Sequence, residues 1–414
     1  MNYSKLLQTI LDITEEMMVA GAEVSRVEDS INRMLVAYGC SEDRINVFII
    51  TANIQVTFEA PDGEIITQIR QIIRSDTNYD RLDYLNDLSR KVCNQKPDVE
   101  EIRSDFQDIM NRPTHRISVN YFGQILIAAS FAVFFGGGPS EALASGVLGL
   151  AVAIVIRYLS GINFNQLAKL FIASIIAGFL AIGLTSVGIG HYADKIMIGA
   201  IMLLIPGIPL TNAVRDMLTG DIVTGLLRMF NSLLCAITIA GGFAIPMIIV
   251  GKYFVLGHTG TYLWNMGNFG TFGIPLISAL LGSLGFAIFF NVRKKQLIYG
   301  SIGGMAATLI YLLMMSYTSN IFVANFAAAI FAAFYAERMA VINRAPATIF
   351  TTTSAVPLIP GGALYYSMQG LVSGSHTEFS DYGMTCITVA LAISLGFVVV
   401  TLVRKYYSYV VKMK

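Results

Sequence analysis

The stretches LIPGIPLTN at residues 204–212 and LIPGGALYY at residues 358–366 share their first four residues, and both lie in strongly apolar segments. Proline removes a backbone donor and clashes with the preceding helical turn, and glycine tolerates strained dihedrals. We therefore expect each segment to be a membrane helix that stops and restarts at its Pro-Gly pair. In hydrocarbon, the freed backbone groups persist only where they are buried in protein or line a wet cavity.

The shared LIPG motif belongs to a longer internal repeat with a constant offset of 154 residues. At this offset Gly146 and Gly149 fall on Gly300 and Gly303, Gly220 falls on Gly374, and Gly242-Phe243 falls on Gly396-Phe397. The offset lays five apolar segments over five others. Because five is odd, the second set enters the membrane from the opposite side, as in many secondary transporters. A duplicated scaffold or channel is the alternative.

Composition agrees with a membrane protein, since 55% of the 414 residues are hydrophobic and only 13% are charged. Soluble domains carry about 25% charged residues. Ten segments meet or approach the roughly 20 apolar residues that a membrane span needs. These are residues 119–136, 142–159, 167–187, 195–213, 226–250, 274–290, 297–315, 321–336, 346–366 and 383–403.

Charge separates a head from this membrane body and sets its orientation. Residues 1–116 hold 13 of the 28 Lys and Arg residues and 20 of the 27 Asp and Glu residues. An acidic head and a net charge of +1 give no reason to expect a nucleic-acid partner. Acidic residues in the first 20 positions speak against a signal peptide, so we expect a cytoplasmic head. With the N-terminus inside, 13 basic residues of the body face inward and two face outward, which places both termini in the cytoplasm at the plasma membrane.

The predicted fold class is an α-helical polytopic membrane protein with ten transmembrane helices, arranged as two inverted five-helix repeats, and an N-terminal α+β cytoplasmic domain. The predicted domains are residues 1–116 for the head, 117–258 for the first repeat and 270–414 for the second. Within the head, apolar periodicity predicts one amphipathic helix over 3–38, and alternation around the turn PDG at 61–63 predicts a β-hairpin. Further helices are expected over 80–94 and 98–111.

The two Pro-Gly breaks are the predicted substrate site. Each restarting helix points the positive end of its dipole at the gap, which suits a substrate carboxylate. Neighbouring side-chain hydroxyl and amide groups can form hydrogen bonds with the other polar groups of the substrate. The predicted substrate-binding residues are Pro206, Gly207, Thr211, Asn212, Thr353, Ser354, Pro360, Gly361, Gly362, Tyr365 and Tyr366. The alternative is that these kinks serve packing alone.

Ionisable residues near the spans are few, so each is a candidate for coupling or gating. Arg215, Asp216 and Asp221 follow the first break. Asp216 either carries a coupling proton or anchors its helix at the interface, and Arg215 is equally explained by the inward bias of basic residues. No cofactor or metal is expected, because the four histidines are isolated and the four cysteines lack CxxC spacing. No catalytic residue is expected, since the head shows neither a GxSxG elbow nor a P-loop.

The head contains GAEVSRVED at 21–29 and RLDYLNDLSR at 81–90. Together with residues 49–58 and the Pro-Gly segments, these motifs resemble the threonine/serine exporter family over nearly the whole chain. In the first motif, Arg26 can pair with Glu23 or Asp29 on a helix surface, usually a modest structural contact. The functional interpretation is that this charged helix gates the cytoplasmic mouth or feeds it substrate. The cluster comprises Glu23, Ser25, Arg26, Glu28 and Asp29.

The resemblance implies a secondary exporter of small amino acids, above all threonine and serine, driven by proton antiport. Members of the family whose two halves are separate proteins are associated with succinate export, so a small dicarboxylate is the alternative substrate. A solute channel and a membrane-anchored enzyme are the alternatives of other classes. The expected partners are a small-molecule substrate, protons and the lipid bilayer, and a homo-oligomer is left open.

Overall fold

The computed structural model describes residues 2–50, 53–72, 76–113, 115–162, 164–250 and 270–413. The chain divides into two compact units. The first unit consists of Met1–Arg116, Phe290–Lys295 and Met339–Ile349, and the second of Ile117–Phe289, Gln296–Arg338 and Phe350–Lys414. The predicted boundary between the membrane repeats, with Lys252 and His258, lies outside the described residues, so the three predicted domains stay a prediction.

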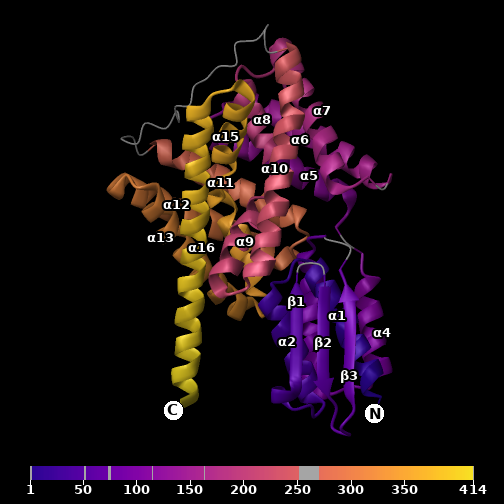
Figure 1. Cartoon of the computed structure of the whole chain (residues 1–414). Coiled ribbons are helices and arrows are strands. Elements are labelled where there is room, and N and C mark those ends of the chain that lie inside the picture. The colour runs from indigo at the N-terminus through magenta and orange to yellow at the C-terminus, as the bar shows by residue number, and fades with distance from the viewer. Residues whose placement is uncertain are drawn as a thin grey trace. The chain divides into compact units, whose positions relative to one another are not determined.

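The first unit contains a three-stranded antiparallel sheet in the order β1-β2-β3, with helices beside it (Figure 1). The turn at 61–63 joins β2 to β3, and Phe58 lies opposite Ile66 in that pair. A third strand, β1, pairs with the other edge of β2, so the predicted hairpin is part of a larger sheet. The elements are α1 (Tyr3–Val19), α2 (Val24–Ala37), η1 (Glu42–Arg44), β1 (Ile45–Ile50), β2 (Asn53–Glu59), β3 (Ile65–Gln71), α3 (Tyr79–Gln95) and α4 (Val99–Met110).

The single helix predicted over residues 3–38 is wrong. α1 ends at Val19 and α2 begins at Val24, and between them Gly21 has a φ of 100°. That dihedral lies in the left-handed region, which cannot continue a right-handed helix and which glycine adopts without steric cost. The hydrophobic period continues across the break, because both helices bury one face in the same core. The helices expected over 80–94 and 98–111 are confirmed as α3 and α4.

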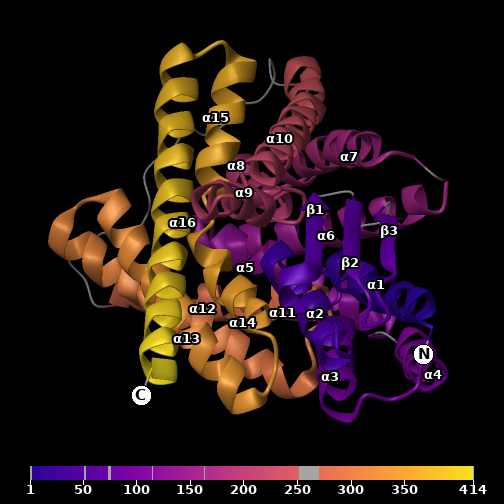
Figure 2. The ribbon, with the colours of Figure 1, turned by 60° about the horizontal axis from the view of Figure 1, so that its bottom comes forward.

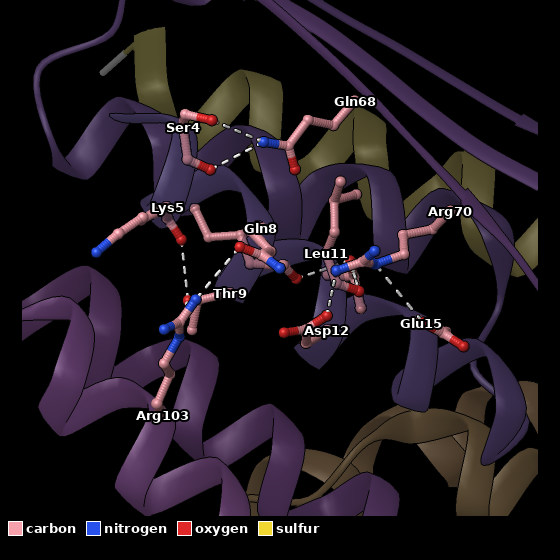
Figure 3. Close-up of polar contacts among 12 residues, drawn as sticks. Ser4, Lys5, Gln8, Thr9, Leu11, Asp12, Glu15, Gln68, Arg70 and Arg103 are labelled. Atoms are coloured by element: carbon pink, nitrogen blue, oxygen red, sulfur yellow. Dashed lines mark hydrogen bonds and ion pairs between the residues drawn. The ribbon is translucent and has the colours of Figure 1, made fainter. Parts of the chain in front are cut away.

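Polar contacts fix α1 between β3 and α4 (Figure 3). The amide of Gln68 donates to the Ser4 carbonyl at 2.9 Å, and Arg70 on the same strand binds Asp12 at 2.5 Å. On the other side, Arg103 Nε donates to Thr9 Oγ1 at 3.2 Å. α1 therefore has an apolar face in the core and a polar edge that sets its register against two neighbours.

The second unit is helical in its described residues, and eight helices of the chain are long and apolar enough to cross a membrane. The eight are α5 (Ile117–Phe134), α6 (Pro139–Ser160), α7 (Gln166–Ser186), α10 (Ile222–Val250), α11 (Gly270–Phe289), α12 (Lys294–Thr318), α13 (Ile321–Asn343) and α16 (His376–Met413). The fourth and ninth predicted segments are not continuous helices. They form α8 (Ala193–Ile201) with α9 (Gly207–Thr219), and α14 (Ala347–Ala355) and η3 (Val356–Leu358) with α15 (Gly361–Ser373).

The first helices of the two predicted repeats, α5 and α11, cross in antiparallel directions at small residues. A Cβ added at Gly123 would lie 2.8 Å from Ile288, and one added at Gly285 would lie 2.9 Å from the Gly123 carbonyl oxygen. Further along α5, Phe131 fills the space beside Gly282. Residue numbers fall along α11 as they rise along α5, so the two helices run in opposite directions. Glycine is needed here because the backbones approach too closely for any side chain.

The third and fifth helices of each repeat pack in the same way. Gly242 of α10 lies against the Phe171 carbonyl of α7, and Gly396 of α16 lies against the Phe326 carbonyl of α13. The helices that follow the breaks also interact across the repeats, since Ser394 of α16 donates to the Thr211 carbonyl of α9 at 3.1 Å. α15 and α16 lie side by side in both ribbon views (Figures 1 and 2). The sequence repeat is thus matched by repeated packing.

Candidate functional site

The two predicted helix breaks are present and have nearly the same backbone geometry. Pro206 precedes α9 with φ −78° and ψ 48°, and Pro360 precedes α15 with φ −75° and ψ 47°. Neither helix has a side-chain cap at its N-terminus. The first amides of a helix lack partners within it, so both N-termini retain donors and a positive dipole end.

The two breaks pack against one another. A Cβ on Gly207 would lie 2.1 Å from Ile359 Cγ2, and a Cβ on Gly361 would lie 4.0 Å from Ile205 Cδ1. An offset of 154 residues carries Gly207 to Gly361 and Ile205 to Ile359, so each break contributes a glycine to one contact and an isoleucine to the other. This exchange is what a twofold pseudo-axis between the breaks produces. A Cβ added at Gly361 would also lie 2.4 Å from Met202 Sδ.

A cavity of about 260 Å³ lies beside the second break. Its wall includes residues 357–360, Gly362 and Ala363, with rings from the end of α5 and the start of α11. Asn325, Tyr311 and Thr385 supply its polar side chains. The lining residues are Phe134, Phe135, Phe272, Pro275, Tyr311, Leu312, Met315, Ile321, Asn325, Pro357, Leu358, Ile359, Pro360, Gly362, Ala363, Thr385 and Val389.

The lining of this cavity is mainly apolar, with a few polar groups beside the second break. The backbone of Gly362 and Ala363 in its wall belongs to the uncapped first turn of α15, where amide donors suit a carboxylate. Aromatic and aliphatic side chains cover most of the rest. None of the described lining residues is Asp, Glu, Lys or Arg.

Only part of the predicted substrate set lies in this wall. Pro360 and Gly362 do, and the ring of Phe135 packs where a Gly362 side chain would be, 2.7 Å from its Cβ position. Tyr365 is 2% exposed and its hydroxyl points to Met197 Sδ at 3.8 Å. Tyr366 contacts α8, as described below.

The remaining predicted residues serve packing or backbone contacts in this conformation. Thr353 and Ser354 are fully buried, beside Gly300 and Gly303 of α12 respectively. Thr211 returns a hydrogen bond to the Gly207 carbonyl at 3.0 Å, which ties the first turn of α9. Pro206 and Asn212 are half-buried. The assignment of these residues to the substrate site stays a prediction.

Among the coupling candidates, Asp216 is 6% exposed and forms an ion pair with Arg228 of α10 at 2.5 Å. Asp221 is exposed and begins the turn between α9 and α10, where its amide donates to the Asp216 carbonyl at 2.9 Å. Arg215 is half-buried. The Arg228 guanidinium, which does not release its proton in proteins, gives Asp216 a permanent positive partner, and the anchoring and proton-carrying interpretations of Asp216 both stay predictions.

The head motif lies at the start of α2, and Asp29 has a partner other than the expected Arg26. Asp29 pairs with Arg33 at 2.9 Å rather than with Arg26, whose buried Nε has no hydrogen-bond partner among the described residues. Glu23 Oε1 accepts a hydrogen bond from Thr348 Oγ1 at 3.3 Å. Ser25 and Glu28 are exposed.

The first unit also brings a second loop against the head. The amides of Tyr79 and Asp80 donate to the carbonyls of Phe290 and Asn291, both at 2.9 Å. Arg293 binds Asp83 at 2.7 Å and lies over the Tyr84 ring at 3.9 Å. Burial acts to lower the pKa of Arg293, but Asp83, Tyr84 and Asp80 outweigh it and raise that pKa. Residues 290–295 and 339–349 are thus held by the motifs at 81–90 and 21–29 that carried the family resemblance.

Sequence reasoning missed Phe135, Tyr311, Asn325 and Thr385 of the cavity wall. Each lies in an ordinary apolar span, where nothing local distinguishes a cavity wall from a lipid-facing or packed side chain. Asn325, an amide inside an Ala-rich helix, was the one available signal.

The fold and site define a multi-pass membrane protein in which two broken helices meet beside a small cavity. Comparison with known families extends this description. A model described as "Putative threonine/serine exporter" matches residues 8–250, and one described as "Threonine/Serine exporter, ThrE" matches residues 275–403. The chain belongs to the threonine/serine exporter family, a family of membrane transporters, which confirms the resemblance found in the sequence.

Two similar curated proteins carry the same description, and a third is uncharacterized. A "Probable threonine/serine exporter" of Mycobacterium tuberculosis is 21% identical over 95% of this chain and 76% of its own length. A "Threonine/serine exporter" of Corynebacterium glutamicum is 20% identical over 92% of this chain and 78% of its own length. An uncharacterized protein of Schizosaccharomyces pombe is 24% identical over 60% of this chain and 31% of its own length. No solved structure matches the chain.

Proposed function

We propose that this chain is a secondary exporter of threonine and serine that exchanges its substrate for protons across the plasma membrane. The observation that carries the proposal is the reciprocal contact of the two helix breaks, Gly207 with Ile359 and Gly361 with Ile205. A twofold-related pair of broken helices gives two conformations of similar energy that open to opposite sides. Relatives named as threonine/serine exporters, at about a fifth identity, support the substrate class.

The proposed architecture is ten membrane segments in two inverted five-helix repeats. The antiparallel crossing of α5 and α11 supports inversion, because equivalent helices of inverted repeats run in opposite directions. The two broken segments supply the fourth and ninth crossings. At about 1.5 Å per residue, α8 and α9 span only about 14 and 20 Å, so each needs its partner to cross about 30 Å of hydrocarbon.

Cytoplasmic termini are part of the proposal. The loops 290–295 and 339–349, which carry Arg293 and Arg344, belong to the same compact unit as residues 1–116. This grouping supports placing the head and these basic loops on the same side of the membrane. The excess of basic residues in the loops assigns that side to the cytoplasm.

In this proposal the substrate occupies the cavity beside the second break. Its carboxylate binds the backbone amides of Gly362 and Ala363 in the first turn of α15, and Asn325, Thr385 and Tyr311 bind the ammonium and hydroxyl groups. The methyl group of threonine packs against Phe135 and neighbouring apolar side chains. The absence of Lys and Arg from the described lining favours a zwitterion over a dicarboxylate, because a second carboxylate in an apolar cavity needs a compensating cation.

The test is counterflow in proteoliposomes with radiolabelled threonine, serine and succinate. We expect saturable exchange of threonine and serine and little exchange of succinate. Thr385→Val should raise the half-saturation concentration for threonine at least about fivefold, consistent with about 1 kcal/mol for one lost hydrogen bond. Thr401→Val on the same helix removes a hydroxyl with the same kind of i−4 backbone bond outside the cavity, and serves as the matched control.

Other outcomes identify the competing functions. Preferred exchange of succinate would replace the substrate, and conductance without saturation would replace the transporter by a channel. Equal effects of the Thr385 and Thr401 variants would remove the cavity from the proposed pathway.

A further inference from the structure

A buried ion pair lies at the start of α8. Asp194 is 4% exposed and Lys195 is 5% exposed, with 3.3 Å between Lys195 Nζ and Asp194 Oδ2. Tyr366 of α15 joins them: it accepts from Lys195 Nζ at 2.8 Å and donates to Asp194 Oδ2 at 3.4 Å. The ammonium also lies 5.5 Å from the centre of the Tyr366 ring. We call Asp194, Lys195 and Tyr366 the Asp194 cluster.

One oxygen of this cluster is unused. Asp194 Oδ1 is buried and has no hydrogen-bond partner among the described residues. A buried carboxylate is costly unless both oxygens are compensated, and intramembrane acids usually mark ion or proton pathways. An oxygen left open in this way is a place for a proton to bind.

Three other buried or half-buried acids of the second unit have partners of a different kind. Asp216 pairs with Arg228 and Glu337 with Arg404, and neither arginine deprotonates. Glu141 accepts hydrogen bonds from the amides of Gly138 and His191 and from the Ser140 hydroxyl. Asp194 differs because its charged partner is a lysine and one of its oxygens is open.

The surroundings of the cluster contain few other titratable groups. α8 packs against α5, α6, α7 and α15. From α15, Tyr365 packs on the Tyr366 ring, and Tyr382 of α16 lies on the same ring at 5.1 Å. Glu141 of α6 reaches the segment before α8 through the His191 amide. Tyr121 of α5 and Lys169 of α7 lie in the first turns of their helices, away from the start of α8.

We infer that the Asp194 cluster is the proton-coupling site of the exporter. When the site is open to the outside, a proton from the medium binds the Asp194 carboxylate and forms the O–H bond of a carboxylic acid, while Lys195 stays an ammonium. After the change of conformation that O–H bond breaks and the proton passes to the cytoplasmic solution. No electrons are transferred, and one positive charge moves inward for each proton carried. This inference rests on the proposed proton antiport.

The position of the cluster explains how proton binding affects conformation. α8 belongs to the first repeat and α15 to the second, so the Lys195–Tyr366 and Tyr366–Asp194 hydrogen bonds join the two repeats next to the break. Protonation removes the negative charge that holds the ammonium and the phenol together, which weakens this junction. At the 154-residue offset, Asp194 and Lys195 fall on Thr348 and Ile349, so the second repeat carries no equivalent charge. Proton binding therefore acts on one repeat and biases one of the two conformations.

The test separates coupling from transport in proteoliposomes loaded with labelled threonine. In the wild-type protein, an acidic external medium should make threonine efflux severalfold faster than it is with the same pH on both sides of the membrane. Asp194→Asn should lose this acceleration, with a ratio near one, because an amide does not take up the proton, and Asp194→Glu should restore it. Glu337→Gln is the matched control, since Glu337 pairs with Arg404 in the same unit and should keep the acceleration.

Two further variants keep the inference testable if Asp194→Asn fails to insert. Lys195→Gln removes the ammonium, so the pH of half-maximal efflux should rise, and an unchanged pH profile would overturn the inference. Tyr366→Phe keeps the ring but loses both hydrogen bonds, and should reduce the acceleration.

The outcomes also separate this inference from the proposed function. Failure of the wild-type protein to exchange threonine or serine contradicts the proposed function itself. Wild-type exchange with acceleration retained in Asp194→Asn overturns the coupling site alone. Loss of the acceleration in Asp216→Asn but not in Asp194→Asn would assign the proton to Asp216 instead.

Discussion

The contact between the two breaks predicts a severe effect for the smallest possible change, Gly207→Ala. The added Cβ would lie 2.1 Å from Ile359 Cγ2, while carbon atoms in contact need about 3.5–4.0 Å. The breaks must then separate by about 1.5 Å. Ile359 is β-branched and 8% exposed, so its methyl group has little room to rotate away.

Overpacking of this kind costs about 1–3 kcal/mol. If the breaks touch only in the conformation described, a cost near the middle of that range depopulates it about 30-fold, since about 1.4 kcal/mol is a factor of ten. Transport needs both conformations, so threonine efflux should fall at least about tenfold while insertion is unchanged. Gly361→Ala should be milder, because its Cβ would meet the flexible Met202 side chain.

The assay is efflux from proteoliposomes, with thermal unfolding of the purified protein measured in parallel. Gly183→Ala is the matched control, since nothing lies within 4 Å of its Cβ position in α7. Ile359→Ala should restore part of the thermal stability lost in Gly207→Ala, because it removes the clashing methyl group. Wild-type efflux in Gly207→Ala, or no coupling between the two substitutions, would refute the contact between the breaks.

Three further predictions follow from the same geometry. Gly285→Ala places a Cβ 2.9 Å from the Gly123 carbonyl and should lower stability by about 1–3 kcal/mol in thermal unfolding; a neutral result contradicts the close crossing of α5 and α11. Arg228→Met leaves the buried Asp216 without its guanidinium and should cost about 3 kcal/mol, more than Asp216→Asn, and the reverse order would argue against an anchoring pair. Burial, and then the nearby Asp98, Cys93 and Glu101, raise the pKa of Tyr38 from 10.0 to about 12, so its contribution to stability is complete below about pH 10 and is lost as the pH rises through about 12. The midpoint temperature of thermal unfolding should therefore fall less between pH 10 and 12 for Tyr38→Phe than for the wild-type protein. Parallel curves of midpoint against pH for the two proteins would contradict this assignment.

The membrane class, the helix breaks and the family were all predictable from the sequence. These properties depend on local chemistry: apolar runs of fixed length, a proline that removes an amide donor, and motifs that keep their residues together along the chain. The repeat was visible because a constant offset of 154 residues matches LIPG and several glycines without reference to any contact. At Gly242 and Gly396 these glycines proved to be sites where two backbones approach closely, and at the two breaks they leave room for the side chains of Ile359 and Met202.

The break in the first head helix could not be predicted in the same way. Residues 3–38 keep one apolar period because α1 and α2 bury faces in a common core, and only the φ of 100° at Gly21 shows that the axis changes direction. A glycine inside a helical pattern does not by itself distinguish a tolerated residue from a turn.

By itself the sequence determined which segments are apolar and where helices must stop, because these follow from each residue and its near neighbours. Tertiary structure alone decided which polar groups meet. Asp194 and Lys195, at the start of the fourth predicted segment, are buried against Tyr366, which lies 171 residues after Lys195, and Asp216 is paired with Arg228. Charges in a low-dielectric interior take their chemical role from partners brought together by folding, and no spacing along the chain encodes those partners.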